Sequence, residues 1–218
     1  MTQNYDWIAE FGTEKLQGKD GEVDTNTLSS LDVVMIYFSA HWCPPCKGFT
    51  PVLVEKYQKL KEAGKKFECV FVSSDQSQKD FDGYFAEMPW LAMQYSDVAN
   101  KEKLRGKHGC HNFPYLVLCD AKTGDTITTN GRGGISGKNP IENFPFHPKA
   151  VYDVSENMDD ITDGLAFLLV QDGCDPEVQK ANGDILNQVI AQKKDHNIKT
   201  FYTVNGGGRL RLLGLNAI

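Results

Sequence analysis

A run of apolar residues that ends at a pair of cysteines constrains the fold of this chain most. Residues 33–38 are continuously apolar and rich in β-branched and aromatic side chains, the pattern of a central strand covered on both faces. Cys43 and Cys46 follow in the motif WCPPC, and apolar residues then recur at helical spacing over residues 45–62. We therefore predict a buried strand, a turn that carries both cysteines, and an amphipathic helix that ends near Gly64.

Alternating strand and helix patterns continue on both sides of the motif. Such alternation, closed by a hairpin, predicts an α/β fold with a mixed central sheet flanked by helices. The glycine stretches at 131–134 and 205–208 lack a nucleotide-binding fingerprint and are predicted to be loops. The apolar residues 88–93 are predicted to form a packed connection between a helix and a strand, with a groove for a partner as the alternative. The further predicted elements are a hairpin in residues 14–25, strands at 67–74 and 115–120, helices within SQKDFDGYFAEM and DVANKEKLRGKH, and a hairpin partner strand at 123–129.

A domain boundary is predicted at GKNPIENFPFHPKA, where prolines 140, 145 and 148 should interrupt any regular element. Residues 1–147 then form the domain with WCPPC, and residues 148–218 form a smaller second unit without a CxxC motif. Within that unit we expect a strand in 164–174, a helix in DPEVQKANGDILNQVIAQKK and a strand at 198–204.

The cysteine spacing is compatible with a metal clamp, a structural crosslink or a working redox pair. A thiolate is the nucleophile in disulfide exchange, and a helix N-terminus lowers the pKa of a thiol placed there. Cys43 should occupy that position, with Cys46 in the first helical turn, close enough to resolve a mixed disulfide formed on Cys43. A CxxC between a buried strand and an amphipathic helix therefore favours the redox reading.

The residues around the cysteines support this arrangement. Pro44 and Pro45 suit the opening of a helix, because their φ is already helical and the N–H groups that they lack would be unpaired there. Trp42 offers a flat apolar surface beside the nucleophile. Lys47 either adds positive potential or is a solvated helix residue.

The segments FSAHWCPPCKGFTPVL and FVSSDQSQKDFDGYFAEMPWLA resemble the tryparedoxin and nucleoredoxin branch of the thioredoxin superfamily. The resemblance runs from about residue 12 to residue 147 and implies a thioredoxin-like fold. Residues 143–156 are similar to the nucleoredoxin continuation in particular, which implies a second thioredoxin-like domain without the cysteine pair. LRLLGLNAI at 210–218 resembles the stretch before a late strand of that fold, so we expect a partial, C-terminally truncated domain. An incomplete sheet leaves an open edge, so this unit should be weakly stable, docked tightly on the first domain, or completed by another copy in a homo-oligomer.

The same resemblance implies roles for residues far from the motif. HNFPYLVL matches the segment with the cis-proline that faces the cysteines, here Pro114, and implies that the backbone of Phe113 helps to hold the substrate. Most thioredoxins carry a buried acid six residues before the nucleophile, where this chain has Tyr37, so the proton acceptor for Cys46 is unassigned. Residues 74–76 replace an acidic stretch of tryparedoxins, which argues against trypanothione as the electron donor.

Zinc is the metal alternative. Cys43, Cys46 and Cys110 with His108 or His111 would supply a Cys₃His ligand set. Structural zinc sites usually draw their second ligand pair from a regularly spaced motif, which HGCH does not provide. We therefore predict no metal and expect both histidines at the surface near a helix end.

The other cysteines are predicted to have no redox role. Cys69 and Cys119 lie within apolar strand runs and read as small core residues. Cys174 follows a strand and precedes a helix, as Cys43 does, but Glu177 stands where a resolving cysteine would be. A reactive monothiol at Cys174 is the open alternative.

The net charge and the spacing of the cysteines limit the class of partner and the compartment that we expect for this chain. The 23 basic and 29 acidic residues give a formal charge of −6, which argues against nucleic acid or an anionic membrane as the main partner. The scattered cysteines and the absence of a signal-like start predict a reducing compartment, the cytoplasm or also the nucleus. The primary hypothesis is a protein-disulfide reductase without a bound cofactor, served by a thiol or reductase donor; the alternative is a redox-regulated protein-binding module.

Overall fold

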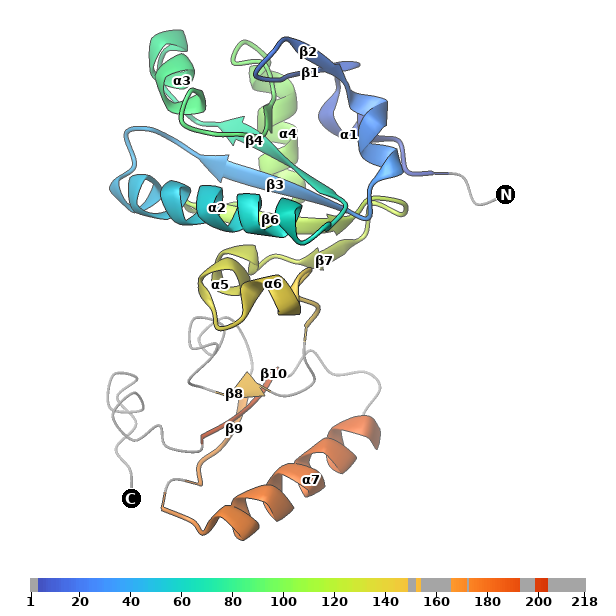
Figure 1. The fold of residues 1–218 in the computed structure, drawn as a ribbon, viewed down its shortest axis with the longest axis vertical. Helices are drawn as coiled ribbons and strands as arrows, with labels where there is room; N and C mark the ends of the chain where they lie inside the picture. The colour runs from blue at the N-terminus through green and yellow to red at the C-terminus, as the bar shows by residue number, and fades with distance from the viewer. Residues whose placement is uncertain (1–3, 149–151, 154–165, 172, 193–198, 204–218) are drawn as a thin grey trace. The chain divides into compact units, whose positions relative to one another are not determined.

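The computed structural model describes residues 4–148, 152–153, 166–171, 173–192 and 199–203 of the chain. The chain divides into two compact units, Met1–His147 (unit 1) and Pro148–Ile218 (unit 2). Figure 1 shows the fold of unit 1, and the cysteine motif lies in this unit. Within the described ranges, no helix is both long and apolar enough to cross a bilayer.

A mixed seven-stranded sheet forms the centre of unit 1, with the order β2-β1-β5-β4-β3-β6-β7. β3 pairs in parallel with β4 and antiparallel with β6, which confirms the predicted mixed sheet. The antiparallel pair β1–β2 confirms the hairpin expected in residues 14–25. The strands are β1 (Lys15–Gln17), β2 (Glu22–Asp24), β3 (Val33–Ser39), β4 (Phe67–Ser73), β5 (Leu91–Ala92), β6 (Tyr115–Asp120) and β7 (Thr126–Thr128).

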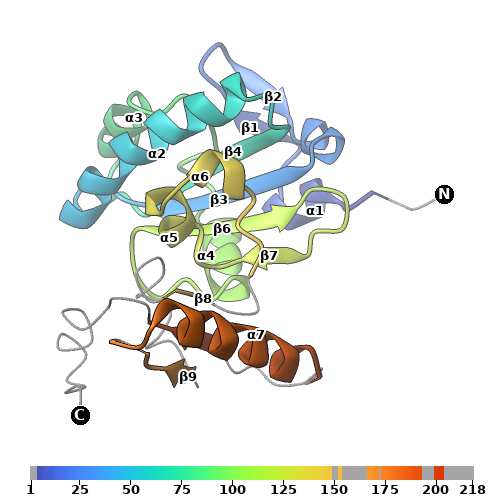
Figure 2. The ribbon, with the colours of Figure 1, turned by 60° about the horizontal axis from the view of Figure 1, so that its bottom comes forward.

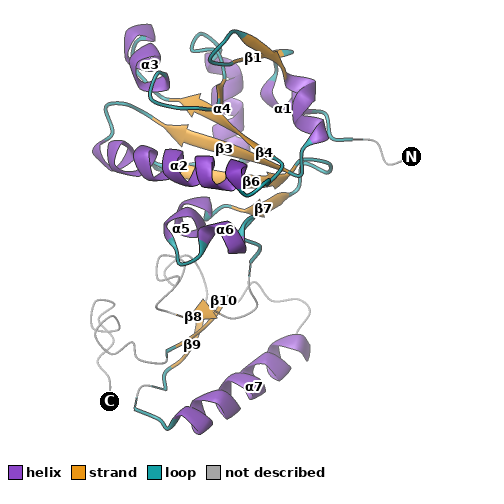
Figure 3. Cartoon of the chain, viewed as in Figure 1, coloured by secondary structure: helices purple, strands orange, loops and turns teal. Residues whose placement is uncertain are grey.

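The two faces of this sheet are covered by different helices (Figures 1 to 3). Buried side chains of α2, α3 and α5 pack on one face, and those of α1, η1 and α4 pack on the other. The helices of unit 1 are α1 (Trp7–Phe11), the 3₁₀ helix η1 (Thr25–Ser30), α2 (Pro44–Glu62), α3 (Gln78–Phe85), α4 (Val98–Lys107), α5 (Gly131–Ser136) and α6 (Pro140–Asn143).

β3 is buried along its whole length, as its continuous apolar run predicts. Because side chains alternate across a strand, Met35 and Tyr37 point into the core under α2 and α3. Val34, Ile36 and Phe38 point into the opposite core. This two-sided burial fixes the end of β3, and with it the position of the cysteine motif.

The prediction of a loop at residues 131–134 is wrong, because these residues begin α5. The side chain of Asn130 caps this helix by accepting a hydrogen bond from the N–H of Gly133 at 3.0 Å. A Cβ atom on Gly131 would lie 2.7 Å from the carbonyl oxygen of Leu116, so glycine lets α5 lie against β6. Likewise, Pro140 does not interrupt regular structure but opens the short helix α6, the position at which proline suits a helix.

Unit 2 contains a parallel three-stranded sheet with the order β8-β10-β9. Its elements are β8 (Tyr152–Asp153), β9 (Ala166–Leu169), α7 (Pro176–Gln192) and β10 (Lys199–Tyr202). The predicted strand, helix and strand are therefore present. Residues 205–218, which hold the predicted loop at 205–208 and the segment LRLLGLNAI, lie outside the described residues, so the truncated domain and its completion by a second copy stay predictions.

Candidate active site

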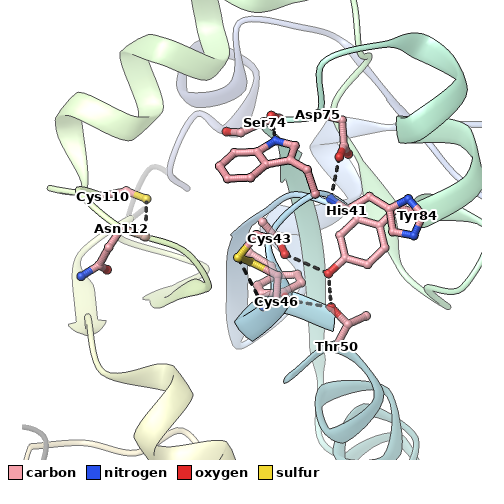
Figure 4. Close-up of a disulfide and its surroundings, with 12 residues drawn as sticks. His41, Cys43, Cys46, Thr50, Ser74, Asp75, Tyr84, Cys110 and Asn112 are labelled. Atoms are coloured by element: carbon pink, nitrogen blue, oxygen red, sulfur yellow. Dashed lines mark hydrogen bonds between the residues drawn. A yellow bond between two sulfur atoms is a disulfide. The ribbon is translucent and has the colours of Figure 1, made fainter. Parts of the chain in front are cut away.

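Cys43 and Cys46 lie where β3 leads into α2, and their sulfur atoms form a disulfide, with Cα atoms 5.3 Å apart (Figure 4). Cys43 is the N-cap of α2, and its sulfur accepts a hydrogen bond from the N–H of Cys46 at 3.3 Å. Cys43 is 5% exposed, whereas Cys46 is completely buried. Solvent therefore reaches only one of the two sulfur-bearing residues.

The predicted supporting residues surround this N-terminus. Pro44 and Pro45 are the first two residues of α2, where a missing N–H breaks no helical hydrogen bond. Lys47 is exposed, and its backbone N–H donates to the carbonyl oxygen of Cys43 at 3.2 Å. Trp42 is 52% exposed, so a large apolar surface is open to solvent beside the disulfide.

The loop after β4 holds the segment that precedes the cysteines. The indole N–H of Trp42 donates to the carbonyl oxygen of Ser74 at 2.9 Å, and the N–H of His41 donates to Asp75 Oδ1 at 2.6 Å (Figure 4). Asp75 Oδ2 in turn accepts from Ser73 Oγ at 2.7 Å. These bonds fix Trp42 although it is exposed. Sequence reasoning missed this role, because it considered residues 74–76 only in relation to the electron donor.

Phe113 and Pro114, which directly precede β6, bring a second aromatic side chain to the cysteine pair. The peptide bond between them is cis, as the family resemblance implied. Phe113 packs against the buried cluster that Cys43 and Cys46 form with Ala40. Its ring also meets that of Trp42 edge-on, with centroids 6.2 Å apart. Two aromatic side chains thus flank the disulfide and give its surroundings an apolar character.

A network of buried hydroxyl groups joins β3, α2 and α3 close to the disulfide. Thr50 Oγ1 lies 2.8 Å from the hydroxyl of Tyr37 and 2.5 Å from that of Tyr84, and Ser39 Oγ lies 3.0 Å from Tyr84 (Figure 4). Burial raises the pKa of Tyr37 far above its ordinary value. The position that most thioredoxins fill with an acid therefore holds a neutral hydroxyl. Sequence reasoning did not predict this network. The signal that could have revealed it is the presence of hydroxyl-bearing residues within or beside apolar runs.

Cys110 lies near the site but in a different environment. Its thiol lies 3.5 Å from the carbonyl oxygen of Asn112 (Figure 4). Burial raises the pKa of the Cys110 thiol to about 11, against the opposing effect of Arg105. No group of three or more metal-binding side chains occurs in the part of the chain that the structure describes, so the geometry gives the zinc alternative no support.

The surface position predicted for His108 is wrong, whereas His111 is exposed as expected. His108 is 8% exposed, and its Nε2 lies 3.0 Å from Oε1 of Glu10, a residue of α1. Glu10 also accepts a hydrogen bond from Tyr5 at 2.6 Å and pairs with Lys107. Sequence reasoning missed this cluster because it did not predict α1, which brings Glu10 to the end of α4.

The remaining cysteines differ in their exposure to solvent. Cys69 and Cys119 are buried in the core, as predicted, and burial raises the pKa of both thiols, that of Cys119 to about 12. Cys174 is exposed just before α7. Among the described cysteines, only Cys43 and Cys46 form a disulfide. It lies at the N-terminus of α2, beside the aromatic side chains of Trp42 and Phe113.

Comparison with known proteins agrees with this geometry. The family model described as thioredoxin-like matches residues 31–126. Nucleoredoxin from Bos taurus is 43% identical over 161 residues, which are 73% of this chain and 37% of the nucleoredoxin. The chain therefore spans little more than a third of the length of that relative.

Tryparedoxins match over most of their own length. Tryparedoxin from Trypanosoma brucei brucei is 40% identical over 135 residues, covering 62% of this chain and 92% of the relative. The crystal structure of native tryparedoxin I from Crithidia fasciculata superimposes with a TM-score of 0.61 at 41% identity, covering 66% of this chain and all of that structure. The sheet order, the strand–cysteine–helix junction and these identities lead to one assignment. The chain belongs to the tryparedoxin and nucleoredoxin branch of the thioredoxin-like oxidoreductases.

Proposed function

We propose that the chain reduces disulfide bonds of protein substrates through Cys43 and Cys46, with Cys43 as the nucleophile and Cys46 as the resolving thiol. The observation that carries this assignment is the unequal placement of the pair. Cys43 is the helix cap and retains solvent access, whereas Cys46 is completely buried. Of the two residues, only Cys43 has exposed surface that a target disulfide can approach.

In the first step, the Cys43 thiolate attacks one sulfur of the target disulfide. A mixed disulfide forms on Cys43 as the target bond breaks, and the other target sulfur leaves as a thiolate that takes up a proton. The N–H of Cys46, which lies 3.3 Å from Cys43 Sγ, stabilises negative charge on the attacking sulfur.

In the second step, Cys46 loses its proton and attacks Cys43 Sγ. This forms the intramolecular disulfide and releases the second target thiol, so two electrons have passed from the pair to the target. The Cα separation of 5.3 Å suits a disulfide without backbone movement. An external dithiol or a reductase must then reduce the pair for the next cycle.

Substitution of each cysteine by serine tests the order of attack. Cys46→Ser should accumulate a mixed disulfide with an oxidised protein substrate, because no resolving thiol remains. Cys43→Ser should accumulate none. Non-reducing electrophoresis and intact mass measure the adduct, and Cys174→Ser in the same backgrounds controls for adducts on the exposed thiol.

Two outcomes would overturn the proposal. Adduct formation by Cys43→Ser alone would reverse the two roles. Failure of the reduced wild-type protein to reduce any protein disulfide, with partner binding that still changes on oxidation, would favour the redox-regulated binding module.

A further inference from the structure

Arg105, in the last turn of α4, lies against one of the two aromatic side chains that flank the disulfide. The centre of its guanidinium group is 5.2 Å from the ring centroid of Phe113, within the range of a cation–π interaction. Phe113 in turn packs on the buried cluster of Ala40, Cys43 and Cys46. The positive charge of Arg105 is therefore one side chain away from the cluster that holds the two cysteines.

The contacts of Arg105 hold this charge in place. Nη1 donates to Oε1 of Glu102, one helical turn earlier, at 2.9 Å, and the Nε atom is buried. The side chain of Arg105 is nevertheless 30% exposed. A guanidinium group has five N–H donors in a rigid fork, so its bond to Glu102 and its hydrogen bond with the Cys110 thiol leave donors for another carboxylate. Because the group is already ordered, binding such a carboxylate costs little side-chain entropy.

The chain as a whole is acidic, but basic side chains are exposed around the cysteine motif. The chain carries a formal charge of −6. Next to the disulfide, however, Lys47 is exposed and Arg105 is partly exposed. The carboxylate of Asp75 is turned inward to His41 and Ser73. Glu102, whose side chain is 61% exposed, is the acid that pairs with Arg105, so the pair lies where a bound protein can meet it.

We propose that Arg105 is a specificity-determining residue, whose guanidinium group binds an acidic side chain close to the disulfide of the target protein. The inference rests on the proposed disulfide-reductase function and names the class of substrate that this function prefers. Phe113 and Trp42 supply apolar contact, which does not depend on the charge of the target. Arg105 distinguishes acidic targets from neutral ones. Targets with an acidic residue beside the reactive cysteine are reduced faster than neutral ones.

Two synthetic peptides test this proposal. Both contain the same intramolecular disulfide, and they differ only in a Glu or a Gln beside one cysteine. The pre-reduced protein is mixed with each peptide, and the second-order rate constant of reduction is measured in a single turnover. The rate constants with dithiothreitol alone correct for the intrinsic reactivity of each disulfide.

The wild-type protein should reduce the Glu peptide about three to five times faster than the Gln peptide, the upper part of the range for an exposed ion pair. This ratio should fall towards 1 at about 0.5 M salt, because such pairs are screened. Arg105→Gln should also give a ratio near 1, and Arg105→Lys should keep part of the preference. Lys103→Gln, an exposed site on the same helix, removes an equal charge and should keep the full ratio.

The outcomes distinguish failure of the role proposed for Arg105 from failure of the proposed reductase function. A wild-type ratio of 1, or a ratio that Arg105→Gln leaves unchanged, would refute the role of Arg105 while the reductase function stands. An equal loss of preference in Lys103→Gln would also refute it, because the effect would then follow net charge alone. Reduction of neither peptide by the wild-type protein would overturn the reductase function as well.

Discussion

Replacement of Glu10 by glutamine should destabilise unit 1 strongly at neutral pH. The Glu10 side chain is almost completely buried, which raises its pKa, but hydrogen bonds from His108, Lys107 and Tyr5 outweigh this effect. Together they lower the pKa of Glu10 from its ordinary value of 4.5 to about 2. At about 1.4 kcal/mol for each pH unit, the ionised carboxylate contributes about 3 kcal/mol to folding. Glu10→Gln removes this charge and should cost about that amount.

The sign of the pH dependence follows from the lowered pKa. The contribution of Glu10 is complete above pH 4.5, because the carboxylate is then ionised in both the folded and the unfolded protein. It is lost as the pH falls from 4.5 towards 2, since the unfolded chain binds the proton first. The difference in stability between wild type and Glu10→Gln should therefore shrink from about 3 kcal/mol at pH 7 to about 1.4 kcal/mol at pH 3.

Denaturation followed by tryptophan fluorescence measures this difference for unit 1, because the three tryptophans of the chain, Trp7, Trp42 and Trp90, all lie in that unit. Glu55→Gln, which removes an exposed carboxylate from α2, is the matched control and should leave the midpoint unchanged. A loss below about 1 kcal/mol for Glu10→Gln at pH 7, or the same loss at pH 7 and pH 3, would refute the reasoning.

Gly134→Ala should destabilise unit 1 by about 1–3 kcal/mol in the same denaturation assay, because its Cβ would lie 2.3 Å from the ring of Phe146. Gly83→Ala, whose Cβ meets nothing within 4 Å in α3, is the control and should be neutral or slightly stabilising. In the oxidised, folded protein, iodoacetamide should alkylate the exposed Cys174 at least about ten times faster than Cys110, whose thiol is buried and has a pKa of about 11. Peptide mapping by mass would contradict this if Cys110 were labelled first.

Much of the fold could be predicted because its signals are local. A continuous apolar run needs cover on both faces, and this requirement identified β3 and β4. Prolines at the first positions of a helix and apolar residues at helical spacing defined α2 to within a residue or two. The same local patterns placed Cys43 at the helix start. The cis bond before Pro114 came from the family resemblance and not from any local pattern.

Other elements resisted prediction because their stability comes from packing. Glycine disfavours helices in isolation, so residues 131–134 looked like a loop. In the folded unit, however, Gly131 allows α5 to approach β6, and Asn130 caps the helix. Similarly, α1 has only five residues and no strong periodic pattern, yet it supplies the buried Glu10.

The sequence by itself thus determined the junction of strand, cysteine pair and helix, since each of these features depends on neighbouring residues. Only the tertiary structure decided what surrounds that junction. Trp42 is fixed by a carbonyl group 32 positions away, and Glu10 meets His108 across 98 positions. Arg105 reaches Phe113 only because α4 ends beside the loop with the cis peptide bond. Such contacts depend on how the chain returns to the sheet, which no local pattern of residues encodes.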